Sequence, residues 1–277
     1  MINWLHTYHP NRILLDLGMV NIYWYGFFIA MGIALALFLA IYLGKKYGVQ
    51  KELVIDLLFW LVIFGLIGAR LYHVMINWQY YSEHLLEIIM VWKGGLAIHG
   101  GIIAGIITIY YFTKKQQINF WKMTAILAPG LALAQTLGRW GNYFNQELFG
   151  LPTDLPWGIP IDILYRPIEY VFVHYFHPVF LYESLGNLLI FIILILLHWY
   201  FAKKKQTNTL IYFSITAVYL ALYSMLRFGM EFLRTDETLM LFGWRWPQVI
   251  SILIIIACVS GFVYFAKRQK KRNTDGI

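Results

Sequence analysis

The sequence contains a single cysteine among its 277 residues, and only 13% of the residues are charged. Cys258 lies in an apolar run and has no second cysteine with which to form a disulfide. We therefore interpret it as a small buried hydrophobic residue. A soluble domain has about 25% charged residues. The shortage of charge excludes an ordinary soluble globular protein.

Signatures of common enzyme classes are missing as well. The sequence has no P-loop, no GxSxG element, no HExxH motif and no cysteine metal cluster. The eight histidines show no metal-ligand spacing, so we expect no metal site. We also expect no other cofactor and no nucleic-acid partner. No internal repeat is present, which argues against a transporter built from inverted repeats.

What the chain does have is apolar sequence, with 60% hydrophobic residues and a mean hydropathy of +0.61. We predict an all-α, polytopic membrane protein that forms one integral membrane domain over residues 1–277. Seven apolar segments approach the ~20 residues that a helix needs to cross a bilayer. They are 22–44, 53–76, 96–113, 123–140, 179–201, 209–228 and 247–266. We expect no cleavable signal peptide, because the first 21 residues lack a basic region followed by a short apolar stretch.

Clusters of basic residues follow the first, third, fifth and seventh segments. They are Lys45, Lys46 and Lys51; Lys114, Lys115 and Lys122; Lys203, Lys204 and Lys205; and Lys267, Arg268, Lys270, Lys271 and Arg272. Because positive residues are retained in the cytoplasm, we expect the amino terminus outside and the carboxyl terminus on the cytoplasmic side of the membrane. The longest connection, 141–178, then forms a small extracytoplasmic head.

The remaining basic residues are arginine with one exception. They are Arg12, Arg70, Lys93, Arg139, Arg166, Arg227, Arg234 and Arg245. Arginine adds to its charge a planar fork that grips phosphate or carboxylate bidentately. This bias suggests that an anionic group binds on the outer side. Pairing with Glu147, Glu183 or Glu231 inside the protein is the alternative, and the two interpretations are compatible.

The segment GRWGNYFNQELFG, residues 138–150, ends one membrane-length run. Its glycines surround several polar side chains, and its candidate site residues are Arg139, Asn142, Asn145, Glu147 and Gly150. An arginine within a membrane costs roughly 2.5–3.5 kcal/mol on insertion scales, which makes it a candidate for function. The alternative is a polar helix cap at the lipid boundary.

A second polar group, GGLAIHGG, covers residues 94–101 and contains His99. A neutral imidazole can take a proton from a thiol. The glycines alone are explained by close helix packing, with Gly101 and Gly105 in a small-xxx-small pattern. That packing does not explain the histidine, so we consider His99 a candidate base.

The third group ends the sixth apolar segment. Tyr223, Arg227 and Glu231 recur every four residues, and Arg234 follows Glu231 by three. This spacing predicts that all four side chains lie along one stripe of a helix. A plain ion pair between Arg227 and Glu231 within that helix is the alternative.

Two further groups open apolar segments. Tyr182 and Glu183 enter the fifth segment together. Asn187 follows Glu183 by four residues. This pair either braces an arginine or anchors the chain at the aromatic belt. Tyr25 belongs to IYWYG, residues 22–26, for which an aromatic anchor is the default interpretation.

Together these motifs resemble one family, the bacterial prolipoprotein diacylglyceryl transferases. Segment 138–150 matches the family hallmark G-R-x-G-N-x-x-N-x-E-x-x-G at every fixed position, and GGLAIHGG, LYE and R-x-x-x-E-x-x-R match in the same order. The resemblance covers essentially the whole chain. Two positions depart from many relatives, with Ala125 in place of an aspartate and Phe180 in place of a glutamine. Both concern the bracing of the fourth and fifth spans rather than the reaction.

The resemblance implies transfer of the diacylglyceryl group of phosphatidylglycerol to the lipobox cysteine of a secreted preprolipoprotein. A thioether forms and glycerol 1-phosphate leaves, in the first step of bacterial lipoprotein maturation. The implied partners are phosphatidylglycerol, lipobox-containing preprolipoproteins and membrane lipids. Because the sulfur comes from the substrate, the enzyme itself needs no catalytic cysteine.

The resemblance also implies roles for the candidate residues. Arg139 and Arg227 stabilise the charge that grows on the leaving phosphate. His99 is the candidate base for the thiol, and the phosphate of the lipid is the other candidate acceptor. The substrate-binding set is Tyr25, Arg139, Asn142, Asn145, Glu147, Gly150, Tyr223, Arg227, Glu231 and Arg234. Asn142, Asn145 and Glu147 would orient the head group and hold Arg139, and Tyr25 and Tyr223 would bond glycerol or phosphate oxygens. Glu231 and Arg234 would organise the site.

Two functions from other classes compete with this interpretation. A transporter or flippase for an anionic lipid would use the same arginines without a base, so it would tolerate loss of His99. A receptor-like protein that binds lipidated peptides would show no turnover.

Overall fold

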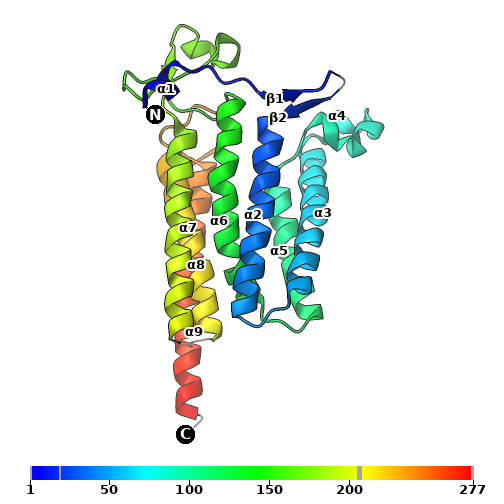
Figure 1. The fold of residues 1–277 in the computed structure, drawn as a ribbon, viewed down its shortest axis with the longest axis vertical. Helices are drawn as coiled ribbons and strands as arrows, with labels where there is room; N and C mark the ends of the chain where they lie inside the picture. The colour runs from blue at the N-terminus through cyan, green and yellow to red at the C-terminus, as the bar shows by residue number, and fades with distance from the viewer. Residues whose placement is uncertain (1, 19, 205–207, 276–277) are drawn as a thin grey trace. The chain divides into compact units, whose positions relative to one another are not determined.

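A computed structural model describes residues 2–18, 20–204 and 208–275, which are mainly helical (Figure 1). The chain divides into two compact units. The first unit comprises Met1–Leu39 and Leu127–Ile277, and the second comprises Ala40–Ile126. Lys205, and the side chain of Arg272, lie outside what the structure describes.

A helix covers each of the seven predicted apolar segments. These helices are α2 (Trp24–Lys46), α3 (Lys51–Ile76), α5 (Ile98–Lys115), α6 (Phe120–Phe144), α7 (Val179–Lys203), α8 (Thr209–Met230) and α9 (Trp246–Asp275). Five of them, α2, α3, α7, α8 and α9, are long and apolar enough to cross a membrane. The helices α5 and α6 are less apolar, because α5 contains His99 and ends in Lys114 and Lys115, and polar residues end α6.

Short elements that the sequence did not predict connect these helices. Three two-stranded antiparallel sheets are formed by β1 (Ile13–Asp16) with β2 (Asn21–Tyr23), β3 (Ile159–Pro160) with β4 (Tyr175–Phe176), and β5 (Met240–Leu241) with β6 (Trp244–Arg245). Short helices are α1 (Ile2–Thr7), α4 (Trp78–Tyr81), η1 (Leu85–Ile89), η2 (Val91–Lys93), η3 (Ile163–Tyr165) and η4 (Ile168–Tyr170). The chain is mainly helical, as predicted, and antiparallel hairpins fix several of the connections between helices.

In the first unit, α8 packs against both α7 and α9. The head of this unit has its own apolar core. Its buried members are Leu5, Tyr143, Phe144, Phe149, Ile159, Ile161, Phe176 and Phe180. The ring of Phe180 at the start of α7 stacks on Tyr143 near the end of α6, with centroids 4.5 Å apart. Phe180 therefore joins the two helices through ring packing.

A polar contact also holds the head. The carboxamide of Gln146 accepts a hydrogen bond from the backbone N–H of Asp162 at 2.7 Å and donates to its carboxylate at 2.6 Å. His9 lies 2.9 Å from the same carboxylate. The Gln146 hydrogen bond lowers the pKa of Asp162 below its usual value; burial opposes this shift and the His9 contact adds to it.

In the second unit, α3 and α5 form a close pair. A methyl group added at Gly68 would lie 2.4 Å from the Cβ of Ala104, and one added at Gly100 would lie 2.2 Å from the carbonyl oxygen of Gly68. Only glycine allows this approach. Gly101 and Gly105 face α3 more loosely, so the predicted small-residue packing has its tightest point one residue earlier. Ala125, in α6, is fully buried.

Arg70 ties the loop after α4 to the end of α3. Its guanidinium donates to the backbone carbonyls of Ile88, Gly94 and Gly95 at 2.8, 2.7 and 3.0 Å, and also to that of Glu87. The side chain is buried. Arg70 therefore has a structural role in loop 83–97, which leads directly to His99.

Candidate functional site

Two buried carboxylates at the top of α7 and α8 collect the arginines of the first unit. Glu183, in the second turn of α7, is 3% exposed, and Glu231, which caps the end of α8, is 0% exposed. A buried carboxylate is costly unless it is paired. Each of these two is paired with more than one guanidinium, as described below.

Glu183 is shared by two arginines from different helices. Its Oε2 lies 2.6 Å from Nε of Arg139 in α6, and its Oε1 lies 3.1 Å from Nη1 of Arg227 in α8. The carboxylate thus fixes the two guanidiniums side by side. Of the two roles considered for Glu183, bracing an arginine or anchoring the chain at the aromatic belt, the contacts with Arg139 and Arg227 support bracing.

Glu231 is also shared. Its Oε2 lies 2.7 Å from Nη2 of Arg227, one helical turn earlier, and its Oε1 accepts a hydrogen bond from Nε of Arg245 at 2.8 Å. The predicted alternative of an Arg227–Glu231 ion pair is therefore present. It coexists with the Glu183 contact, so Arg227 is held from two sides.

Arg234 does not continue the helical stripe. Helix α8 ends at Met230 and Glu231 is its cap, so the prediction that Arg234 shares this stripe is wrong. The chain turns instead, and Arg234 pairs with Asp236 at 2.6 Å and lies 3.9 Å from Glu183. Burial alone would raise the pKa of Asp236, but the hydrogen bond from Arg234 and the positive charges of Arg234, Arg245 and Arg227 together outweigh it and lower the pKa of this carboxyl.

Gly150 allows this turn to approach the head. The segment at Arg234 forms a bridge with Gly150, and the backbone N–H of Leu151 donates to the carbonyl of Leu233 at 2.7 Å. A methyl group at Gly150 would lie 2.7 Å from the Cβ of His177 and 2.9 Å from the Leu233 carbonyl. Gly150 is thus required for close backbone contact beside the cluster.

The polar residues of segment 138–150 lie on the other side of Arg139. Nη1 of Arg139 donates to the side-chain oxygen of Asn142 at 3.3 Å, and the amide of Asn142 donates to Glu147 at 2.8 Å. Asn145 donates to the same Glu147 oxygen at 3.3 Å. Glu147 therefore acts on Arg139 through Asn142. The expected direct pairing between Glu147 and an arginine is not found among the described residues.

The two tyrosines of the predicted set lie on different helices, Tyr25 on α2 and Tyr223 on α8. The ring of Tyr25, at the start of α2, packs on α6 at Gly141, where a methyl group would lie 2.6 Å from the ring. Tyr23 lies in β2, and the ring of Trp24 stacks on Phe144 at 4.5 Å, so Trp24 belongs to packing inside the unit. Tyr223 lies one turn before Arg227 on α8 and stacks loosely on Tyr219.

His99 lies in the first turn of α5 and belongs to the second unit. Its side chain is exposed, and the ring of Tyr72 is its aromatic neighbour, with centroids 6.0 Å apart. Within the described part of the chain the imidazole has no hydrogen-bond partner. An exposed, unpaired imidazole is free to accept a proton from a bound group.

Sequence reasoning did not select Arg245 as a site residue. In the sequence it is only one of the arginines outside the basic clusters. It lies 14 residues after Glu231, and no helix connects the two positions. The β5–β6 hairpin closes this gap with a two-residue turn in which Phe242 and Gly243 both have positive φ, at 51° and 79°. The hairpin thereby delivers Arg245 to Glu231.

The arginine bias among the basic residues outside the lysine-rich clusters has two sources. Arg70 binds backbone carbonyls, as described above. Arg166 likewise donates to the carbonyls of Ile161 and Val171 at 2.7 and 2.8 Å, and Arg12 donates to the carbonyl of Asn145 at 3.1 Å. The other four, Arg139, Arg227, Arg234 and Arg245, make up the cluster with Glu183, Glu231 and Asp236. We call these seven residues the arginine cluster.

Within the arginine cluster, four guanidiniums pair directly with three carboxylates. Glu147, which reaches Arg139 through Asn142, adds a fourth carboxylate to the same hydrogen-bonded network. The side chains of Arg139 and Arg227 are each 18% exposed, whereas the carboxylates that hold them are almost fully covered. An anion can therefore reach the guanidiniums without meeting the carboxylates. No group of His, Cys, Asp and Glu suited to a metal ion occurs among the described residues.

Comparison with known proteins points to the same family as the motifs. The family model described as prolipoprotein diacylglyceryl transferase matches residues 12–264. Relatives named phosphatidylglycerol–prolipoprotein diacylglyceryl transferase include one from Synechocystis sp., 42% identical over 94% of this chain and 91% of the relative. Another, from Finegoldia magna, is 42% identical over 90% of this chain and 93% of the relative. The chain belongs to the prolipoprotein diacylglyceryl transferase family.

Proposed function

We propose that the arginine cluster binds the phosphate of phosphatidylglycerol during the reaction that this membrane enzyme performs, the transfer of the diacylglyceryl group to the cysteine thiol of a prolipoprotein. The observation that carries the proposal is the sharing of Glu183 by Arg139 and Arg227. One carboxylate holds two partly exposed guanidiniums together, at the membrane end of the polar segment that defines the family.

The accessible guanidiniums of the cluster suit this substrate. A phosphodiester carries one negative charge, and the side chains of Arg139 and Arg227 are each 18% exposed, so an anion can contact them. The thiolate sulfur attacks the glycerol carbon that bears the phosphate, and the carbon–oxygen bond breaks. The electron pair of that bond leaves with the phosphate, whose charge therefore increases. Cationic donors fixed in advance stabilise this growing charge more than they stabilise the bound lipid.

Arg139 has donors to spare for such an oxygen. A guanidinium has five N–H groups. Arg139 uses its Nε for Glu183 and one N–H of Nη1 for Asn142. Its Nη2 makes no hydrogen bond within the described part of the chain. This leaves one edge of the fork for a phosphate oxygen, in the bidentate geometry that lysine does not reproduce.

The remaining members of the cluster act through Arg139 and Arg227. Asn142 orients Arg139, with Glu147 and Asn145 behind it, and Glu231 orients Arg227, with Arg245 behind it. Guanidiniums held in this way need no reorganisation when charge develops. Tyr25 and Tyr223 supply hydroxyl groups for glycerol or phosphate oxygens.

His99 is the proposed acceptor of the thiol proton. The support is its exposed ring, its lack of a described hydrogen-bond partner and its place directly after the glycine-rich loop that Arg70 fixes. The sulfur attacks well only as a thiolate, so a base that accepts the proton raises the rate. The alternative acceptor is the phosphate of the lipid, in which case His99 is dispensable.

The activity itself is tested by incubating a lipobox peptide with phosphatidylglycerol and the purified enzyme, followed by mass spectrometry. We expect a mass gain of one diacylglyceryl unit on the cysteine, and no gain on the matched peptide in which serine replaces that cysteine. An unmodified cysteine peptide, under conditions in which the lipid binds, would instead support transport or peptide binding without transfer.

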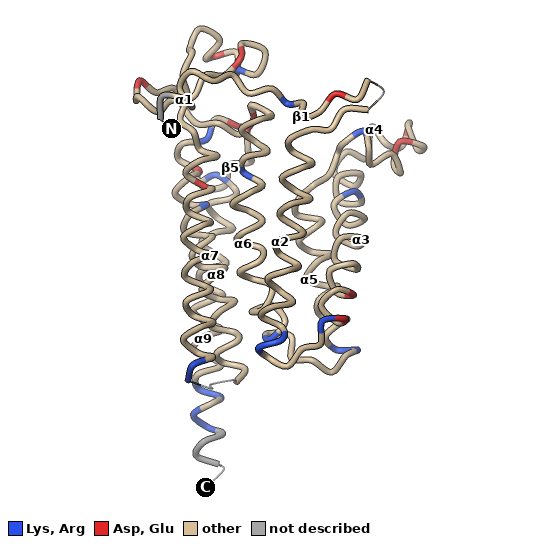
Figure 2. The backbone as a smooth tube through the Cα atoms, viewed as in Figure 1, with Lys and Arg blue, Asp and Glu red and all other residues tan. Residues whose placement is uncertain are grey.

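We also propose that all seven long helices cross the membrane, with the amino terminus and the head 141–178 outside. In the first unit, basic residues gather at the ends of α7 and α9 away from the head (Figure 2). In the second unit, Lys45, Lys46, Lys51, Lys114 and Lys115 lie at the helix ends joined by short turns. Positive residues of this kind favour the cytoplasmic side. A preprotein exported across the membrane would then bring its cysteine to the side on which the cluster lies.

Labelling of single cysteines with a membrane-impermeant reagent tests this orientation on a Cys258→Ser background. We expect Asp154→Cys in the head to react from outside and Lys204→Cys to react only after the membrane is opened. Labelling of Lys204→Cys from outside would overturn the orientation while leaving the proposed phosphate site to be judged by its own test.

A further inference from the structure

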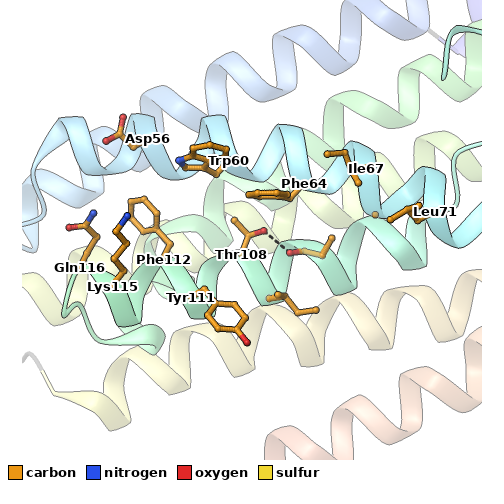
Figure 3. A pocket seen from close by; sticks show the side chains of 13 residues that line it. Asp56, Trp60, Phe64, Ile67, Leu71, Thr108, Tyr111, Phe112, Lys115 and Gln116 are labelled. Carbon is orange, nitrogen blue, oxygen red and sulfur yellow. Dashed lines mark hydrogen bonds between the residues drawn. The ribbon is translucent and has the colours of Figure 1, made fainter. Parts of the chain in front are cut away.

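A groove runs along the α3–α5 pair, built entirely from residues of the second unit. Its volume is about 650 Å³. Figure 3 shows side chains of both helices lining it. Aromatic residues supply much of its wall, among them Trp60 and Phe64 from α3 and Tyr111 from α5. Gly68 and Ala104, which lie where the two helices are close together, also line it.

The length of the groove fits an acyl chain. Its lining on α3 extends from Asp56 to Leu71, which is about 22 Å at 1.5 Å per residue. One leaflet of the hydrocarbon core is about 15 Å thick, half of the ~30 Å total. Thr108 donates its hydroxyl to the carbonyl of Ala104 at 2.7 Å, so it offers no free donor in the middle of the groove. An apolar groove of this length on a membrane helix suits a lipid chain.

One end of the groove is polar and carries both signs of charge. Figure 3 shows Asp56 of α3 and Lys115 and Gln116 of α5 at this end. The side chains of Asp56 and Lys115 are both exposed. Among the described residues, neither forms an ion pair with the other or with any third residue. A cation and an anion that are both free, at the mouth of one acyl-length groove, match a head group that also has both charges.

We propose that this groove binds a zwitterionic glycerophospholipid with a primary ammonium group. Lys115 binds the phosphate, Asp56 binds the ammonium, and one acyl chain lies along the aromatic wall. The carboxylate of Asp56 disfavours a head group that is only anionic, which sets this ligand apart from the anionic donor lipid of the reaction.

The groove also differs from the reaction site in its position on α5. Thr108, which lines the groove, follows His99 by nine residues, or two and a half turns of 3.6 residues. Thr108 and His99 therefore lie on opposite faces of α5. The proposal stands independently of the phosphate site assigned to the arginine cluster.

The sequence offers a matched pair of variants for each part of the groove. Lys115 lines it and its neighbour Lys114 does not; likewise Ile107 lines it and Ile106, equally exposed, does not. The four variants are Lys115→Gln, Lys114→Gln, Ile107→Trp and Ile106→Trp. Native mass spectrometry of the purified enzyme counts the molecules retained from dioleoylphosphatidylethanolamine, dioleoylphosphatidylcholine or dioleoylphosphatidylglycerol. The rate of peptide modification reports whether each variant is folded.

We expect the wild type and the two control variants to retain phosphatidylethanolamine equally. Lys115→Gln should bind it about tenfold more weakly, the factor that a lost hydrogen bond to a charged group produces. Asp56→Asn should weaken phosphatidylethanolamine but not phosphatidylcholine, whose quaternary ammonium has no N–H to donate. Ile107→Trp should lower retention by filling the groove, while its peptide modification rate stays near that of Ile106→Trp.

Two results would overturn the proposal. Equal retention of phosphatidylethanolamine by Lys115→Gln and Lys114→Gln, together with equal retention by Ile107→Trp and Ile106→Trp, would show that the lipid does not occupy this groove. If Lys115→Gln lowers the retention of phosphatidylglycerol as much as that of phosphatidylethanolamine, the groove selects a phosphate alone, and the zwitterionic assignment is wrong.

Discussion

Glu183 of α7 and Arg227 of α8 form a 3.1 Å ion pair although 44 residues separate them in the sequence. The same carboxylate binds Arg139 of α6 at 2.6 Å. Three successive long helices thus meet at one buried carboxylate. The position of both candidate phosphate-binding guanidiniums depends on it.

Replacing Glu183 by glutamine should therefore affect both stability and transfer. The neutral amide no longer compensates Arg139 and Arg227, and breaking a buried pair in this way costs about 3–5 kcal/mol. We expect a clear drop in the thermal midpoint and a transfer rate lower by about 100-fold, as for loss of a fixed donor. Glu169→Gln, in an exposed part of the head, is the control. A Glu183→Gln enzyme with wild-type rate and midpoint would contradict the bracing role.

Arg245 should act as a positioning residue. It holds Glu231, which in turn holds Arg227, so its removal lets the Arg227 guanidinium move. We expect Arg245→Gln to lower kcat about tenfold, with a smaller change in KM for phosphatidylglycerol. Arg245→Lys should recover part of kcat because it restores one charged contact. Equal losses in both variants, confined to the thermal midpoint, would indicate a structural role only.

The pH dependence of the transfer tests His99. A protonated imidazole cannot accept the thiol proton, so the rate of the wild type should fall in acid. The thiol also titrates, so the comparison is with His99→Asn measured on the same peptide. We expect this variant to be slow and to lack the acidic limb. If it keeps substantial activity and the same limb, the phosphate of the lipid is the acceptor.

Asp162 should make the head sensitive to acid. Its pKa is lower in the folded protein than in the unfolded chain, mainly because of the Gln146 hydrogen bond. Its contribution to stability is therefore complete above the unfolded pKa of about 3.9 and is lost as the pH falls through the lower, folded value. The thermal midpoints of wild type and Asp162→Asn should differ at neutral pH and converge in acid. Asp154→Asn, which alters an exposed carboxylate, should follow the wild type throughout.

The long helices were predictable because each carries its own apolar run. All seven expected segments are helical, with ends that differ by a few residues. Whether a helix spans the bilayer depends on its length and on how apolar it is. The polar residues at the end of α6 belong to the candidate site, and they also make this helix less apolar. Five helices meet the criterion by composition, and the seven-span prediction remains a proposal.

The candidate site was predictable only in part. The i, i+4 spacing of Arg227 and Glu231 predicts that the two can form an ion pair, which the structure contains. The sequence also indicated that Glu183 could brace an arginine, and it does so. The place of Arg234 was not predictable from spacing, because the capping of α8 at Glu231 breaks the period that the stripe assumed. Arg245 was missed because a hairpin, rather than helical spacing, brings it to Glu231.

The role of each arginine was equally hidden in the sequence. Nothing in the sequence distinguishes Arg70 and Arg166 from Arg139 and Arg227. In the structure, the first two donate their hydrogen bonds to backbone carbonyls of loops. Such contacts arise wherever a loop leaves carbonyls without partners, and no sequence pattern marks them. The arginine bias is therefore the sum of loop bracing and a compact charged cluster.

The transfer rates of Arg139→Lys and Arg227→Lys test the central claim most directly. A lysine keeps the charge but replaces the planar fork by a single point of contact. In single-turnover reactions of phosphatidylglycerol with a lipobox peptide, each variant should be slower by about 100-fold. Arg268→Lys, an exposed change on α9, should match the wild type. Near-normal rates in both cluster variants would show that charge alone suffices, and would contradict binding of the phosphate by the two guanidinium forks.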